Sequence, residues 1–272
     1  MNHTRSAPDR DDARRTLARV LLTSEPGDDR IRSWTRGIGR RLLHESHHIR
    51  EPDFTEIHVN DLGFLFKAYD GRFLNGLCGI VLGSEGLTFR LSSRMTRAGG
   101  KTTRFRYPDG TRHYEIALGT SIIFDGFRAH DPEVTVCGLC CGDRLEALQR
   151  VFEHELVHLV EWLCWDASHC GRERFQGIAA RLFGHRSHTH QLITRAERAA
   201  GLGLTVGARV TFRYQGKRLH GRVNRITKRA TVLVADRAGE RWSDGRRYVR
   251  YYVPLGDLTA VPADPADDAG QG

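Results

Sequence analysis

The sequence has no long apolar run. No stretch of about eighteen apolar residues, the least that a membrane-spanning helix needs, occurs in its 272 residues. Residues Met1 to Arg15 are polar and charged and contain no apolar segment of the kind that a secretory signal requires. We therefore expect a soluble, cytoplasmic protein without a membrane partner.

The chain also lacks a complete cysteine-type zinc motif. Its six cysteines, with no export signal, are expected to be reduced thiols. Cys137, Cys140 and Cys141 form half of a zinc knuckle, but a structural site needs four ligands and no second C-x-x-C follows. Incidental thiols in a loop are the favoured interpretation, although Cys164 would be available as a further ligand.

Acidic residues are too few to balance the basic ones. The chain has 42 Lys and Arg against 33 Asp and Glu, a formal net charge of +9. This surplus favours anionic partners, nucleic acid first, although a solvated arginine-rich surface has the same composition.

The pattern of residues predicts an α+β chain in four parts. Helices are expected at 11–22, 31–44 and 188–200. A β-hairpin is expected around Pro108-Asp109-Gly110, and residues 121–124 are expected to extend its sheet. Short alternating strands follow, as in a small antiparallel barrel. The parts are a flexible or helical basic arm (1–55), a mixed helix and strand domain (56–202), a β-barrel (203–262) and a disordered tail (263–272).

The clearest predicted helix carries the chemistry. Asp143 caps it, and large apolar residues, Phe152 among them, recur every three or four residues from Leu145 to Leu163. Within it, His154, Glu155 and His158 form an HExxH motif, in which the two histidines lie one turn apart on one face. We expect both imidazoles to bind Zn²⁺ and Glu155 to act as general base on water activated by the metal.

A catalytic zinc site needs a third protein ligand. His169, just before the next helix, is the predicted ligand because that position can fold back on the HExxH helix. Adjacent Cys170 would also bind zinc, and the cluster His185, His188 and His190 is a further alternative.

Four segments, in this order, resemble the SprT-like (Spartan) metallopeptidases. They are Tyr69 to Leu77, Ser92 to Gly100, Tyr114 to Leu118, and Arg144 to His158, which ends in HELVH. The likeness extends from about Val59 to about Leu192. It implies a zincin-like fold, a zinc cofactor and cleavage of protein or peptide substrates, which in some members are proteins bound or crosslinked to DNA.

The chain departs from that family at the third ligand. The family has a His in an H-G-x-x-F pattern, and here His169 and Phe175 lie two residues farther apart. Alignment on Phe175 would put Gly171 at the ligand position, which keeps Cys170 as an alternative. The cysteine ribbon of some members is also absent, and the predicted SH3-like barrel stands in its place.

The predicted barrel is basic and contains several tyrosines. Arginines and lysines that contact phosphates, with aromatic side chains for stacking, are how small barrels hold nucleic acid. A barrel that binds protein, or one that only packs on the catalytic domain, fits the same pattern. The residues predicted to bind nucleic acid are Lys217, Arg218, Arg222, Arg225, Lys228 and Arg229.

The sequence therefore predicts a zinc metalloendopeptidase with a basic module that recruits it, with DNA as the expected anionic partner. The alternative is a nucleic-acid-binding protein whose zinc is structural and which cleaves nothing. Four protein ligands with no open position would indicate this alternative.

Overall fold

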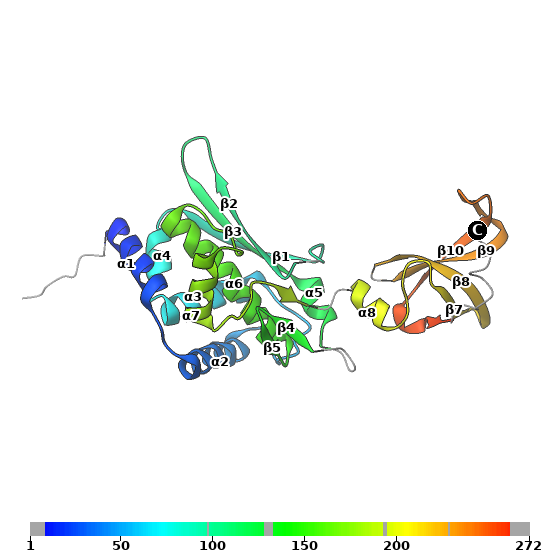
Figure 1. Ribbon diagram of the computed structural model, residues 1–272, viewed down its shortest axis with the longest axis horizontal. Helices are drawn as coiled ribbons and strands as arrows, with labels where there is room; N and C mark the ends of the chain where they lie inside the picture. The colour runs from blue at the N-terminus through cyan, green and yellow to red at the C-terminus, as the bar shows by residue number, and fades with distance from the viewer. Residues whose placement is uncertain (1–8, 97, 128–132, 193–194, 228, 262–272) are drawn as a thin grey trace, which may run out of the picture. The chain divides into compact units, whose positions relative to one another are not determined.

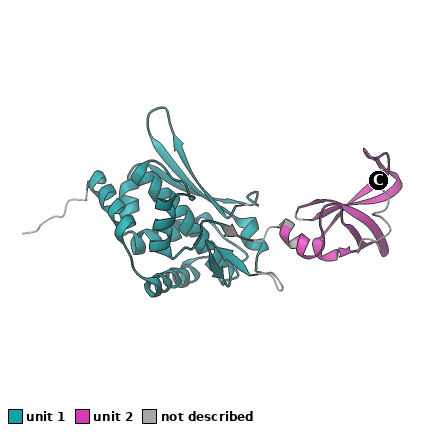
Figure 2. Cartoon of the chain, in the orientation of Figure 1, with its two compact units in different colours: residues 1–192 teal, residues 193–272 magenta. Residues whose placement is uncertain are grey.

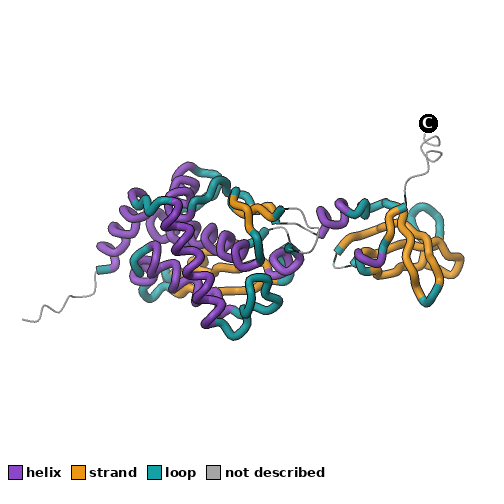
Figure 3. The backbone as a smooth tube through the Cα atoms, turned by 90° about the horizontal axis from the view of Figure 1, so that it is seen from below, coloured by secondary structure: helices purple, strands orange, loops and turns teal. Residues whose placement is uncertain are grey.

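The structure is a computed structural model that describes residues 9–96, 98–127, 133–192, 195–227 and 229–261. The chain forms two compact units, residues 1–192 and 193–272 (Figure 2). The first mixes helices and strands, and the second is mostly strand (Figure 3). The division falls ahead of the predicted boundary at residue 202, because Ala199 on helix α8 (Arg195–Gly201) lies in the core of the second unit.

The predicted N-terminal arm belongs to the first unit. It forms α1 (Arg10–Thr23) and α2 (Asp28–Glu45), as the helical spacing predicts. Leu17 and Leu21 are fully buried, and α1 packs against the helices α4, α6 and α7 described below. The arm thus contributes to the core of the unit that carries the HExxH motif.

A mixed three-stranded sheet, of order β1-β3-β2, forms one side of the first unit (Figure 1). Strands β2 and β3 form the predicted antiparallel hairpin, and β1 runs parallel to β3. A second, small sheet has the order β5-β4-β6. The remaining elements of this unit are α3 (Val59–Phe73), α4 (Leu77–Leu82), β1 (Gly86–Ser92), β2 (Gly100–Arg106), β3 (Arg112–Gly119), α5 (Thr120–Asp125), β4 (Val134–Val136), β5 (Leu139–Cys141), α6 (Arg144–Trp165), α7 (Glu173–Phe183) and β6 (His190–Gln191).

Two local predictions are wrong. Residues 121–124 lie in helix α5 instead of extending the sheet, because β3 ends at Gly119 and this residue is the N-cap of the helix. The helix predicted at 188–200 is divided, because His190 and Gln191 pair with β4 and the helix begins only at Arg195.

Helix α6 lies at the centre of the first unit. It packs against β2 and β3 of the sheet and against most of the other helices. Its N-cap Asp143 accepts a hydrogen bond from the backbone N–H of Glu146 at 2.8 Å, as predicted. It ends at Trp165, and its C-cap is Asp166, whose φ of 58° lies in the left-handed region. Buried on most sides, α6 is a rigid support for the side chains it carries.

The second unit is built on one antiparallel sheet of order β10-β9-β8-β7-β11. The predicted barrel is wrong, because β11 is only two residues long and pairs with β7 alone, so that the five strands do not close. The predicted tail 263–272 lies outside the described residues. The strands are β7 (Arg209–Tyr214), β8 (Lys217–Ile226), β9 (Ala230–Arg241), β10 (Arg247–Val253) and β11 (Thr259–Ala260), with a 3-10 helix η1 (Leu255–Asp257) before the last.

Throughout the described ranges, no helix combines the length and the apolar character needed to cross a membrane.

Candidate metal centre

Three side chains with metal-binding atoms meet beside the middle of α6. The donor atoms of His154, His158 and Cys170 all lie within 4.8 Å of one another. The histidines approach because positions i and i+4 share one face of the helix. Cys170 comes from the loop between α6 and α7. His154 is buried, and the other two side chains are partly exposed. This group can hold a metal ion.

The loop after α6 turns alternate side chains toward the helix. Ser168 and Cys170 are partly buried against it, whereas His169 between them is exposed. The Nδ1 atom of His169 accepts a hydrogen bond from the backbone N–H of Gly171 at 3.1 Å. Within the described residues, Cys170 and not His169 joins the donor group. The geometry thus favours the alternative ligand over the predicted one.

The other predicted alternatives lie elsewhere. His185 Nε2 is 3.0 Å from the carboxylate of Glu153, and His188 Nδ1 is 3.3 Å from the amide of Gln176. The side chain of His190 lies outside the described part of the chain. None of Cys137, Cys140 and Cys141 belongs to a donor group among the described residues.

A chain of hydrogen bonds orients His158. Its Nδ1 atom lies 2.7 Å from Ser168 Oγ, which donates to a carboxylate oxygen of Glu161 at 2.7 Å. Arg174 Nε donates to the other oxygen of that carboxylate at 2.6 Å. Because Nδ1 is engaged, Nε2 is the nitrogen that remains for a metal. Burial, followed by the nearby His169, lowers the pKa of His158 to about 4, which favours the neutral imidazole that a metal requires.

His154 has a different environment. Its Nδ1 atom lies 3.7 Å from the Sγ atom of Cys137, which is buried. Burial raises the pKa of this thiol, so that it stays uncharged, and its sulfur can accept a hydrogen bond from Nδ1–H in the tautomer that offers Nε2 to a metal. The ring of Phe175 packs on both histidines, with its centroid 4.8 Å from that of His154 and 4.5 Å from that of His158. These contacts restrict the orientation of both rings.

Strand β2 holds the carboxyl group of Glu155. Thr102 Oγ1 lies 2.8 Å from Glu155 Oε2 and 2.9 Å from the backbone oxygen of Glu155. Gly100 leaves room for this side chain, because a Cβ atom there would lie 2.6 Å from Glu155 Cγ and the side chain would have to shift. Burial raises the pKa of Glu155 to about 7, although the Thr102 hydrogen bonds oppose this. A carboxyl group with such a pKa can gain and lose a proton near neutral pH.

A buried acid anchors α6 next to His154. Glu153 is fully buried and accepts hydrogen bonds from Tyr69 Oη at 2.8 Å and from Arg150 Nη1 at 2.9 Å, while His185 Nε2 lies 3.0 Å away. Although burial alone would raise the pKa of Glu153, the charge of Arg150 and the His185 hydrogen bond lower it. This network fixes the helix on which the donor group is mounted.

Sequence reasoning missed the residues that support the site. Thr102 is 53 positions from Glu155, so that only the fold brings them together. Ser168 had a local signal, because residues two apart in an extended loop face the same way and Ser168 is two residues before Cys170.

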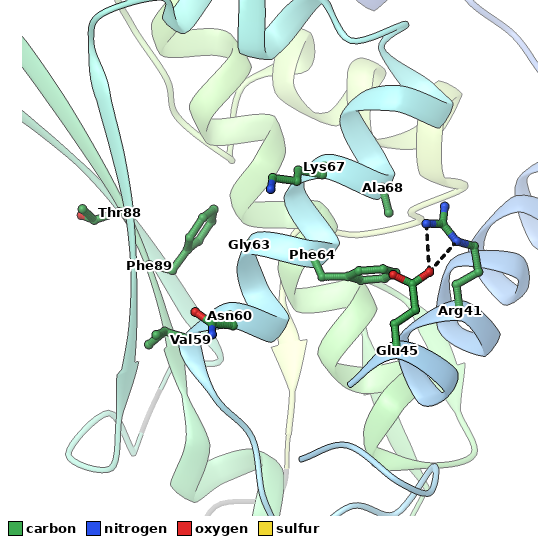
Figure 4. Close-up of a pocket in the computed structure, with 10 residues that line it drawn as sticks. All are labelled: Arg41, Glu45, Val59, Asn60, Gly63, Phe64, Lys67, Ala68, Thr88 and Phe89. Carbon is green, nitrogen blue, oxygen red and sulfur yellow. Dashed lines mark hydrogen bonds and ion pairs between the residues drawn. The ribbon is translucent and has the colours of Figure 1, made fainter. Parts of the chain in front are cut away.

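A pocket of about 620 Å³ lies elsewhere on this unit, between α2, α3 and β1 (Figure 4). It contains Lys67, Phe89 and the ion pair of Arg41 with Glu45, whose atoms are 3.1 Å apart. Among the described residues, no His or Cys lines it. It is therefore separate from the donor group.

The residues predicted to bind nucleic acid belong to the second unit. Lys217, Arg218, Arg222 and Arg225 are exposed on β8, and Arg229 is exposed before β9. Lys228 lies outside the described residues.

Comparison with known proteins found no matching family model, no matching curated protein and no matching solved structure. The resemblance to the SprT-like metallopeptidases stays a prediction.

Proposed function

We propose that the first unit is a zinc-dependent metallopeptidase with a zincin-like fold. His154, His158 and Cys170 are its zinc ligands and Glu155 its general base. One observation carries the proposal: two histidines and a cysteine converge beside a buried carboxyl group that a neighbouring strand holds in place. The SprT-like resemblance supports the same function.

The donor set fits zinc. Imidazole nitrogen and thiolate sulfur are its usual protein ligands, and three such ligands are typical of catalytic sites, whereas structural sites have four. The group has three members among the described residues, which favours an enzyme over a structural zinc site. Bound there, Zn²⁺ would act as a Lewis acid on a peptide carbonyl and would make water more acidic.

The residues of the chain perform the proton transfers. The Glu155 carboxylate accepts a proton from the attacking water and returns it to the leaving amine. Thr102 and Gly100 set the position of that carboxylate. Strand β2 is the edge of its sheet, so an extended peptide can pair with it beside Glu155. This arrangement suits protein or peptide substrates, and proteins bound to DNA are among those that the resemblance suggests.

Replacing Glu155 tests this proposal. Glu155→Gln is expected to retain zinc and to lower the cleavage of an unfolded protein by about 10²–10⁴-fold, because only the base is removed. Cleavage is followed by electrophoresis and zinc by elemental analysis. Glu173→Gln, an exposed change at the start of α7, is the matched control. Normal cleavage by Glu155→Gln would disprove the assignment of the base, and a zinc-loaded wild type that cleaves nothing would favour the structural-zinc alternative.

A further inference from the structure

Most of the excess positive charge of the chain lies in its second unit. The second unit, residues 193–272, has 15 Lys and Arg and eight Asp and Glu, a net charge of +7. Because the whole chain has a net charge of +9, the first unit carries +2. Most of the basic surplus thus lies in this unit and not in the unit with the candidate metal centre.

Strands β7 and β8 place arginines directly opposite each other. In their antiparallel register, Arg213 pairs with Arg218 and Arg209 pairs with Arg222, with Thr211 opposite His220 between them. All six side chains point to the same side, because alternate residues of a strand share a face. The other side carries buried Val210 and Phe212. We call the four residues Arg209, Arg213, Arg218 and Arg222 the arginine face.

Like charges directly opposite each other destabilise a pair of strands. Within the described residues, the side chains of Arg213, Arg218 and Arg222 have no carboxylate at ion-pair distance, whereas Arg250 on β10 binds Glu240 at 2.7 Å. The register is well defined, because Gln215 and Gly216 have φ values of 48° and 76° and form a tight turn between β7 and β8. The fold therefore holds Arg213 and Arg218 opposite each other at a cost to its own stability.

We propose that the arginine face binds the phosphate backbone of a nucleic acid. Successive pairs of opposed residues lie about 7 Å apart along the strands, which forms a regular row of donors. Guanidinium groups bind phosphates through two parallel hydrogen bonds, and Thr211 and His220 add donors between them. The six positions include no apolar side chain, and a protein partner would need an apolar centre to its interface. The face adds Arg209 and Arg213 to the predicted Arg218 and Arg222, and it does not depend on the metal site.

The test compares two double variants of the full chain that lose the same charge. Arg213→Thr with Arg218→Thr removes one opposed pair, and Arg237→Thr with Arg246→Thr removes two exposed arginines outside the β7–β8 hairpin. Binding of a fluorescein-labelled single-stranded DNA of mixed sequence is followed by anisotropy at several salt concentrations. For the first variant, Kd should rise about tenfold or more in low salt. The plot of log association constant against log salt concentration should become less steep, its slope decreasing in magnitude by about 1.4. Binding by the second variant should change little.

Melting temperatures separate this effect from unfolding. Removing opposed charges should leave the Tm unchanged or raise it, and Arg213→Lys with Arg218→Lys should keep most of the binding. Equal weakening by both Thr double variants would overturn the proposal, because net charge alone would then explain binding. A lower Tm for the first variant would contradict the inference that the opposed Arg213 and Arg218 destabilise the fold. Displacement of the DNA by a poly-glutamate peptide at equal charge would assign the face to acidic proteins instead.

Discussion

Ser168 connects the loop that carries Cys170 to the helix that carries His158. Its hydroxyl lies between the Nδ1 atom of His158 and the carboxylate of Glu161. Without it, the imidazole ring can rotate and its Nδ1 atom loses its partner. Ser168→Ala is expected to weaken zinc binding by about 10–100-fold, measured by competition with a chelator of known affinity. Ser33→Ala, an exposed change on α2, should bind zinc normally. Equal affinity of both variants would contradict the orienting role.

Gly100 shows why a residue without chemistry of its own can matter to a site. A methyl group there would meet the side chain of Glu155 at 2.6 Å and would force the carboxyl group to move. Gly100→Ala should therefore lower cleavage about tenfold or more, because small displacements of catalytic groups are costly, while zinc content stays unchanged. Gly37→Ala is the control, because a Cβ atom at Gly37 meets nothing within 4 Å. Wild-type cleavage by Gly100→Ala would show that the carboxyl group has room to adjust.

At the scale of elements, Asp166 joins the end of α6 to the β2–β3 hairpin. Its carboxylate binds Arg104 and Arg106 of β2 and lies 3.2 Å from Arg112 of β3. Partial burial would raise the pKa of Asp166, but these arginines outweigh it and lower the pKa. A carboxyl group whose pKa is lower in the folded state stabilises the fold above its unfolded pKa of about 3.9, and this contribution is lost as the pH falls through the folded value.

Asp166→Asn should therefore lower the Tm at pH 7, and the difference from the wild type should shrink as the pH falls below about 4. Asn tolerates the left-handed conformation of this C-cap, so that the change removes mainly the charge. Thermal melts from pH 7 to pH 3 measure this. A Tm difference between the two proteins that stays constant from pH 7 to pH 3 would show that the charge of Asp166 contributes nothing to stability.

Elements with a strong local pattern could be predicted from the sequence. Helix α6 has an N-cap and a regular apolar repeat, and α7 ends at Gly184, whose φ is 70°. Strands β4 and β6 could not be predicted, because they are two or three residues long and pair across more than 50 positions. The sheet of the second unit was expected to close because its strands alternate, but closure depends on how the edge strands meet, and alternation does not determine this.

The residues of the candidate site also divide into those that a local pattern in the sequence predicts and those that it does not. His154, Glu155 and His158 follow from helical spacing, which the sequence displays directly. The choice between His169 and Cys170 depends on the path of the loop after α6, because neighbouring residues of an extended loop face opposite ways. Thr102 comes from a distant strand, so that no local pattern reveals its contact with Glu155.

At the scale of the whole molecule, the two proposed functions belong to different units. The candidate metal centre and its supporting residues lie within residues 1–192, and the arginine face lies within residues 193–272. Each unit has its own core. The loss of one function therefore need not remove the other, and the two proposals can be tested separately in the full chain.

The most direct test of the account is the zinc content of the purified chain and of three variants. The wild type is expected to hold about one zinc per chain after metal is supplied. His158→Ala and Cys170→Ala should lose it, because each removes a member of the donor group, whereas His169→Ala should keep it. Loss of zinc from His169→Ala together with its retention in Cys170→Ala would contradict the proposed ligand set, and a wild type without zinc would contradict the metal centre itself.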